Sequence, residues 1–127
     1  MLGARDQDST TFSISMSGGR VSPLLDVATK FLLVETVRSR ETQRRTVVLS
    51  DFDAVRRVTS LRHMGVSTLI CGAVSDRLSK RLSSSGLRLI ADTCGPVDEV
   101  ACAFLGGFLT NAAYLMPGCA RRSNDNQ

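Results

Sequence analysis

The sequence predicts an α/β fold in which one mixed five-stranded sheet carries helices on its faces. Two apolar segments, Phe31–Val34 and Val47–Leu49, flank a polar run, which predicts an antiparallel hairpin. After Ser50, short apolar strands alternate with segments of helical periodicity, and this alternation predicts parallel pairing through right-handed crossovers. The 127 residues allow one domain. The expected order of elements is βββαβαβα.

The composition is that of an ordinary globular protein, with 43% hydrophobic and 22% charged residues. We expect a flexible leader over residues 1–10, the folded domain over 11–110 and a tail over 111–127. The sequence has neither a long apolar run that would span a membrane nor the apolar stretch of a signal peptide at its start. A cytoplasmic location is therefore expected.

The strands are predicted from apolar patterning. Phe12–Met16 alternates apolar and small polar residues, which is typical of a strand, and the glycine-containing segment Ser17–Pro23 is expected to be a loop. A polar turn near residues 38–43 joins the strands of the hairpin. Val66–Cys71 and Leu87–Ala91 are the predicted fourth and fifth strands.

The helices are predicted from capping residues and helical spacing. The first begins within Ser50–Asp53, ends near Gly65 and has an expected apolar face of Phe52, Val55, Val58 and Leu61. The second runs from Val74 or Ser75 to Ser85, and Gly86 ends it. The third begins with Pro96 at its first position, and its expected core stripe is Val97, Ala101, Phe104 and Phe108.

This topology predicts a candidate site. The first, fourth and fifth strands run parallel in the simplest arrangement, so their carboxyl ends share one edge, where ligands of open α/β sheets bind. The residues expected there are Gly18, Gly19, Arg20, Cys71, Gly72, Cys94 and Gly95. The N-termini of the second and third helices point to the same edge, offering N–H groups to an anion and lowering the pKa of a nearby thiol.

Cys71 and Cys94 are therefore the candidate metal ligands, with Cys119 from the tail as a possible third. Thiolates bind soft metals and metal–sulfur species. The alternative is that Cys71 is a buried small hydrophobic residue at a strand end. Cys102 is expected on the flank of the third helix, and His63 at the opposite edge of the sheet.

Other classes of function are disfavoured. The net charge is +4, but the basic residues are dispersed and only 5% of residues are aromatic, so a nucleic-acid partner is not expected. The arginines at 38, 40, 44 and 45 are expected to form a solvated face. No catalytic motif or Cys-x-x-Cys pair occurs, which favours a binding module over an enzyme. A hydrolase is disfavoured because the opening strand carries none of the carboxylates that a metal-dependent hydrolase would need.

Several segments resemble the dinitrogenase iron–molybdenum cofactor biosynthesis family, which includes NifX, NafY and the C-terminal domain of NifB. They are Val21–Pro23 followed by Ala28 and Phe31–Val34, then Leu69–Gly72, and finally Cys94–Ala101 with Phe104 and Leu105. The most specific of them is the Gly-Pro-Val-Asp-Glu run that opens the last helix. The resemblance covers residues 11–109, nearly the whole chain.

The resemblance implies a ribonuclease H-like three-layer fold and non-catalytic carriage of an iron–molybdenum or other metal–sulfur cluster, with cluster donor or acceptor proteins as partners. Family members often have His-Phe-Gly where this chain has Leu24-Leu25-Asp26, so the histidine associated with cofactor ligation is absent. This departure shifts the expected ligation to the thiols. The alternative is a metal-free regulatory or interaction module that binds an anionic ligand at the same edge.

Overall fold

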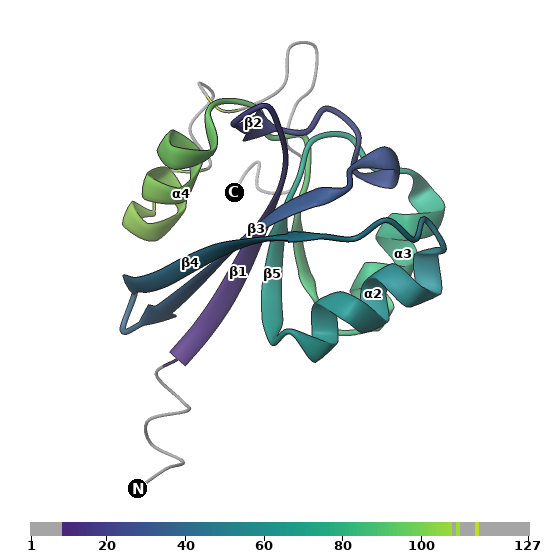
Figure 1. Cartoon of the computed structure of the whole chain (residues 1–127), viewed down its shortest axis with the longest axis horizontal. Helices are drawn as coiled ribbons and strands as arrows, with labels where there is room; N and C mark the ends of the chain where they lie inside the picture. The colour runs from purple at the N-terminus through teal and green to yellow at the C-terminus, as the bar shows by residue number, and fades with distance from the viewer. Residues whose placement is uncertain (1–8, 108, 110–113, 115–127) are drawn as a thin grey trace, which may run out of the picture.

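The computed structural model describes residues 9–107, 109 and 114. It is an α/β fold with a mixed six-stranded sheet and three α-helices (Figure 1). The strands are β1 (Ser9–Ser17), β2 (Arg20–Val21), β3 (Lys30–Val37), β4 (Arg40–Val48), β5 (Val66–Ile70) and β6 (Arg88–Ile90). The helices are α2 (Ala54–His63), α3 (Asp76–Ser84) and α4 (Val97–Gly106), and a 3₁₀ turn, η1, spans Leu25–Val27.

The main strands lie in the order β4-β3-β1-β5-β6. β1 pairs antiparallel with β3, β3 pairs antiparallel with β4, and β1, β5 and β6 run parallel. The expected hairpin and the expected parallel set are both confirmed. Because the chain leaves β1 towards β3 on one side and later returns to β5 on the other, the strand order reverses at β1.

The helices lie on both faces of the sheet, with α2 and α3 on one side and α4 on the other (Figure 1). Each side has its own core. The α2/α3 side buries Phe31, Leu33, Leu61 and Leu69, and the α4 side buries Phe12, Ile14, Val34 and Val100. The sheet is therefore the middle of three layers.

The count of five strands was too low, because β2 forms within the segment expected to be a loop. Gly18 and Gly19 have φ values of 60° and 79°, as the two central residues of a tight hairpin turn require, and β2 folds back onto the end of β1. The strand expected at Val47–Leu49 is much longer, since β4 begins at Arg40. Its polar first half gives no apolar pattern in the sequence.

The first strand and the last helix also differ in detail from the expected elements. β1 begins at Ser9, earlier than the Phe12 expected from the apolar pattern. α4 ends at Gly106, and Gly107 follows with a φ of 81°, a common left-handed helix end. The expected stripe position Phe108 and most of the tail lie outside the described residues.

The expected apolar face of the first helix was half wrong. Val58 and Leu61 are buried, but Phe52 and Val55 are exposed. The helix begins one turn later than Ser50, with Asp53 as its cap: an Asp53 carboxylate oxygen accepts a hydrogen bond from the Arg56 backbone N–H. Phe52 therefore precedes the helix.

A buried arginine, which the sequence analysis did not predict, joins α2 to the sheet. Arg57 is only 3% exposed, and its guanidinium lies over the rings of Phe31 and Phe52. It donates hydrogen bonds to the backbone carbonyls of Ala28 and Asp51. Burial lowers the pKa of the Arg57 guanidinium. Arg57 thus fixes η1 and the β4–α2 connection against each other.

Gly72 marks the tightest backbone contact at the end of β5. A Cβ atom at this position would lie 2.4 Å from the Ser22 carbonyl oxygen and 2.7 Å from that of Pro23. Its φ is not positive, so the requirement for glycine here is steric. The segment that follows β2 can approach β5 only because position 72 has no side chain.

We expect Gly72→Ala to lower the free energy of unfolding by about 1–3 kcal/mol, because the backbone must shift to admit the methyl group. Urea denaturation measures this loss, and amide NMR shifts of Leu25 and Ala73 report the displaced segment. Gly107→Ala is the control: it strains a left-handed residue in open space and should leave those shifts unchanged. A Gly72→Ala protein with parental stability and shifts would contradict this view of the contact.

Candidate functional site

Three segments meet where β1, β5 and β6 end. The Val21 N–H donates to the Gly95 carbonyl at 2.9 Å, joining the segment after β1 to the segment after β6. The Leu25 N–H donates to the Ala73 carbonyl, and the Ala73 N–H donates to the Pro23 carbonyl, each at 2.8 Å. The expectation that these segments converge on one edge is confirmed.

The glycines singled out from the sequence build this edge through their backbones. The Gly19 carbonyl accepts a hydrogen bond from the Val97 N–H at 2.9 Å, and Arg20 pairs with Pro96 in an isolated bridge. The Gly72 carbonyl accepts from the Asp92 N–H at 2.8 Å. These groups hold the segments to each other, and their part in binding a ligand stays a prediction.

The helix N-termini at this edge are capped in part by the protein itself. At the start of α3, Asp26 accepts hydrogen bonds from both the backbone N–H and the hydroxyl of Ser75, and the Ser75 hydroxyl accepts from the Leu78 N–H. At the start of α4, the Val97 N–H is bound by Gly19. The N–H groups of Ser75, Leu78 and Val97 are therefore satisfied within the protein, and anion binding by the other N–H groups of these first turns stays a prediction.

The described cysteines differ in their surroundings. Cys71 is fully buried in the core between the sheet and α2/α3, while Cys94 is partly exposed at the carboxyl edge. Cys102 is exposed on α4, as expected for a flank position. None of these three is in a disulfide. Cys119, the possible third ligand, lies outside the described residues.

Burial raises the pKa of the Cys71 thiol to about 12, and the negative charges of Asp92 and Asp26 act in the same direction. The expected lowering by a helix N-terminus is therefore wrong for this residue. A protonated thiol within an aliphatic core is a poor metal ligand. The surroundings of Cys71 match the alternative of a buried small hydrophobic residue.

His63 lies where the sequence predicted. It is the last residue of α2 and is exposed, two residues before the Gly65 turn that leads into β5. The start of β5 is at the edge opposite the carboxyl ends of the parallel strands. No group of three or more His, Cys, Asp or Glu side chains in the described part of the chain is placed to hold a metal ion.

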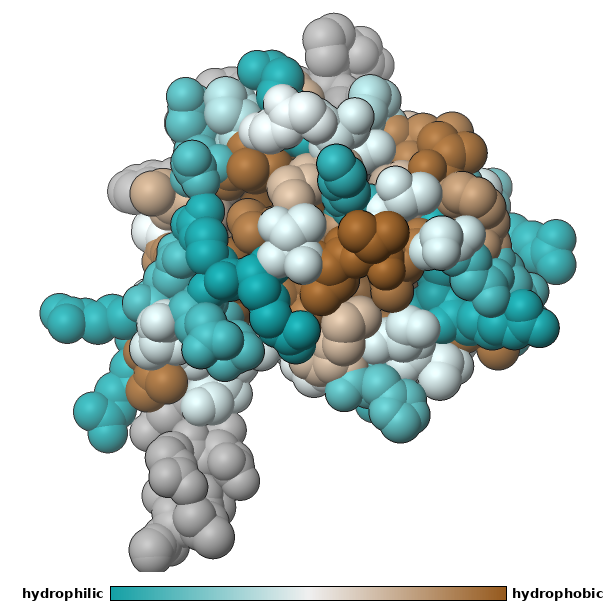
Figure 2. Space-filling view, in the orientation of Figure 1, coloured by the Kyte–Doolittle hydropathy of each residue, from teal (hydrophilic) through white to brown (hydrophobic). Residues whose placement is uncertain are grey.

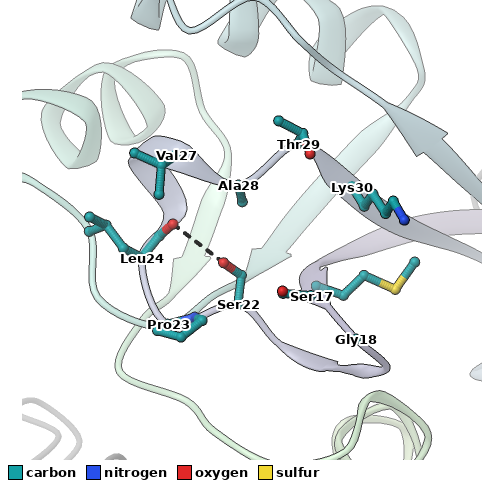
Figure 3. Close-up of a pocket in the computed structure, with 10 residues that line it drawn as sticks. Ser17, Gly18, Ser22, Pro23, Leu24, Val27, Ala28, Thr29 and Lys30 are labelled. Carbon is teal, nitrogen blue, oxygen red and sulfur yellow. Dashed lines mark hydrogen bonds between the residues drawn. The ribbon is translucent and has the colours of Figure 1, made fainter.

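A cavity of about 340 Å³ opens at the carboxyl end of β1, where the strand order reverses (Figure 3). Its lining residues are Met16, Ser17, Gly18, Ser22, Pro23, Leu24, Val27, Ala28, Thr29 and Lys30. Leu24 and Val27 lie on one side, Lys30 and Ser17 on the other, and Ser22 between them (Figure 3). The Ser22 hydroxyl donates to the Leu24 carbonyl at 3.4 Å.

The chemistry of this lining favours an anion. Lys30 is the only described residue in it with an ionisable side chain, and the hydroxyls of Ser17 and Thr29 can donate hydrogen bonds to a ligand. Met16 adds a thioether, which is a soft donor. Of the site residues predicted from the topology, only Gly18 lines the cavity. Ser22, Pro23, Leu24 and Ala28 were singled out only through the family resemblance, although the reversal of strand order at β1 could have directed attention to them.

The arrangement of strands and helices defines a mixed α/β sheet protein with an open site at its switch point. Three solved structures share this fold. They are a candidate dinitrogenase from Methanocaldococcus jannaschii, the apo form of the orange protein from Desulfovibrio gigas, and a candidate NifB protein of the DUF35 family from Thermotoga.

The first is 20% identical, with a TM-score of 0.65 over 80% of this chain and 92% of its own. The orange protein is 20% identical, with a TM-score of 0.62, and the match covers 85% of this chain and 95% of the orange protein. The Thermotoga protein is 21% identical, with a TM-score of 0.62, and the match covers 91% of this chain and 98% of the Thermotoga protein. These identities establish the shared fold alone. No protein-family model matches the sequence. No curated protein matches it either.

In the described part of the chain, no helix has the length and apolar character needed to cross a lipid bilayer.

We expect Cys71 to resist alkylation while the protein is folded. A buried thiol with a raised pKa has almost no thiolate at neutral pH, whereas Cys102 is exposed. Brief treatment with iodoacetamide at pH 7.5, followed by peptide mass spectrometry, should find Cys102 modified and Cys71 unmodified until urea is added. Equal labelling of the two in the native protein would contradict the placement of Cys71.

The raised pKa of Cys71 also predicts a dependence of stability on pH. The folded state holds the proton more tightly than the unfolded state, whose thiol has a pKa near 9. The contribution of Cys71 is therefore fully present below about pH 9 and is lost as the pH rises towards 12, by at most about 1.4 kcal/mol per pH unit. Denaturation of the parent and of Cys71→Ala between pH 8 and 10.5 measures it. The difference between the two proteins should shrink above pH 9, and a constant difference would contradict the prediction.

Proposed function

We propose that this chain binds an anionic metal–sulfur cluster in the cavity at the end of β1 and hands it on without catalysing a reaction. The observation that carries the proposal is the lining itself, in which Lys30 is the only ionisable residue among those described and the hydroxyls of Ser17 and Thr29 are available as donors. The family resemblance supplies the class of ligand. The ribonuclease H-like assignment, the iron–molybdenum cofactor as cargo and partner proteins that donate or accept it belong to the same proposal.

The donors around the cavity fit such a cargo in part. Sulfide-rich clusters carry negative charge, which Lys30 and the hydroxyl groups can balance, and the Met16 thioether can contact a soft metal or sulfide. With no thiolate in the lining, the protein would hold the cluster by electrostatic and hydrogen-bonding contacts. Such contacts exchange readily, which suits a carrier that must release its cargo.

The roles of the thiols follow from their placement. The burial of Cys71 supports a role in packing. Because Cys71 lies inside the core, it could bind a cluster only if the core opened. Cys94 is partly exposed at the same edge as the cavity and, with Cys119 of the tail, remains the candidate for thiolate ligation of a cluster.

A metal-free module that binds another anion at this cavity is the second candidate function. The observation that favours it is the lack of any cysteine or histidine among the lining residues. The position that the family's histidine would occupy is Leu24, which lies on the wall of the cavity. The two functions predict different competition between ligands.

Tetrathiomolybdate, an anionic molybdenum–sulfide species, tests the proposal. After anaerobic incubation and desalting, the full chain should retain visible absorption from this probe. Lys30→Glu should weaken retention by about tenfold, because a charge-assisted contact is replaced by repulsion. Met16→Leu, which removes the sulfur and keeps the volume, should weaken it less. Lys80→Glu on the exposed face of α3 is the matched control and should bind as the parent does.

Competition separates the two candidates. Excess phosphate or sulfate should displace tetrathiomolybdate only weakly if the cavity recognises a metal–sulfur species. Displacement at equal concentrations would favour the metal-free module. Equal retention by the parent and by Lys30→Glu would remove the cavity as the binding site.

A further inference from the structure

β4 is a long edge strand with an unpaired outer side. It spans nine residues, every one of them exposed or partly exposed, and within the described residues it pairs only with β3. Its outward backbone N–H and C=O groups are therefore available to another strand. The opposite edge of the sheet, β6, has only three residues.

The pairing of β4 with β3 divides the strand into two parts. The register shifts between Glu35 and Thr36, where Thr42 is the extra residue on β4. Such a bulge twists the strand and disfavours edge pairing locally. From Gln43 to Val48 the register is regular and contains no proline. This six-residue run can accept an added strand.

The charges along β4 are unevenly satisfied. Arg44 forms a two-point ion pair with Glu41, at 2.6 and 2.8 Å, and contacts Asp98 of α4 at 2.7 Å, so it is not simply solvated as the sequence suggested. Arg40 and Arg45 form no ion pair with any described residue. Both lie on the α2/α3 side of the sheet, since their partners on β3 are Val37 and Leu33. A strand added along Gln43–Val48 would meet the unpaired positive charge of Arg45 on that side.

The strand ends on apolar residues. Val48 is 63% exposed, and Val47 before it is only partly buried. Figure 2 shows a hydrophilic surface over the left-hand half of β4 and a hydrophobic surface beside its right-hand, C-terminal half. A solvated edge strand would be expected to end on polar residues, so two valines here are consistent with a surface that is covered in a complex.

We infer that the Gln43–Val48 edge binds an extended acidic segment of a partner protein, which adds to the sheet as an antiparallel strand. The backbone would supply the affinity, and two side-chain features would supply the choice of partner. One is a carboxylate opposite Arg45, and the other is a pair of apolar residues opposite Val47 and Val48. This inference does not depend on the cargo proposed for the cavity.

Other occupants fit less well. A second copy pairing through β4 would bring two arginine-rich edges together, and a register centred on Arg44 or Arg45 would place like charges directly opposite each other. A nucleic acid would use the arginines but leave the outward backbone groups and the valines without partners. Protection of the edge against aggregation explains the bulge and the charges, but not the exposed Val48.

The probe is a six-residue peptide that begins with two valines and carries glutamate at its fourth position among threonines. In this order the valines lie opposite Val48 and Val47, and the glutamate lies opposite Arg45. NMR titration of the full chain should shift the β4 amides. Hydrogen exchange should show new protection at alternate residues of Gln43–Val48, because the amides between them are already paired with β3.

Three controls make the test specific. A peptide N-methylated at alternate residues keeps its side chains but loses backbone donors, so it should not bind. Arg45→Glu should weaken binding of the parent peptide by about fivefold and be rescued by a peptide with lysine at the fourth position. Arg81→Glu, on the exposed surface of α3, should bind as the parent does.

Several outcomes would overturn the inference. One is shifts that spread over the basic surface without the alternating protection on β4, and another is equal binding of the N-methylated peptide. A dimer that forms through β4 in sedimentation, disrupted by Arg45→Glu or Val48→Lys, would assign the edge to a second copy. If an oligonucleotide bound to the arginines of β4 more tightly than the peptide does, the edge would be assigned to nucleic acid.

Discussion

The close approach of the Ser22–Pro23 backbone to Gly72 is the constraint on which the carboxyl edge depends. The carbonyls of Ser22 and Pro23 occupy the space where a side chain at position 72 would lie. Once they are in place, reciprocal hydrogen bonds with Ala73 fix the chain through Leu25. The same segment then turns through η1 and enters β3, so its path creates the cavity at the end of β1.

The regular part of the fold could be predicted from the sequence, because its signals are local. The glycines at 65 and 86 end two helices with φ values of 81° and 90°, which only glycine adopts easily. The alternation of strands and helices after Ser50 requires parallel pairing whatever the neighbouring sequence. By contrast, the length of β4 was underestimated. An exposed edge strand needs no apolar residues, and the arginines in its first half show no strand pattern.

The site was predicted at the correct edge but with the wrong side chains. The run that ends at Cys71 places two polar residues, Ser67 and Thr68, before three apolar ones, so no alternation in the sequence reveals which face of the sheet each residue occupies. In the structure Cys71 shares the α2/α3 face with Leu69, two residues earlier, and is buried there. The polar side chains that line the cavity belong to two serines, a threonine and a lysine, and no local sequence pattern marks these residues as part of a site. Arg57 was missed for a related reason: nothing local shows that a charged residue will be enclosed by two phenylalanine rings and backbone carbonyls.

Binding of an anionic metal–sulfur species in the cavity bounded by Met16 and Lys30 can be located by anomalous X-ray diffraction at the molybdenum edge, from crystals of the full chain grown with tetrathiomolybdate. We expect an anomalous peak within contact distance of the Lys30 ammonium and the Ser22 hydroxyl. A peak located elsewhere, with this cavity occupied only by solvent, would contradict it.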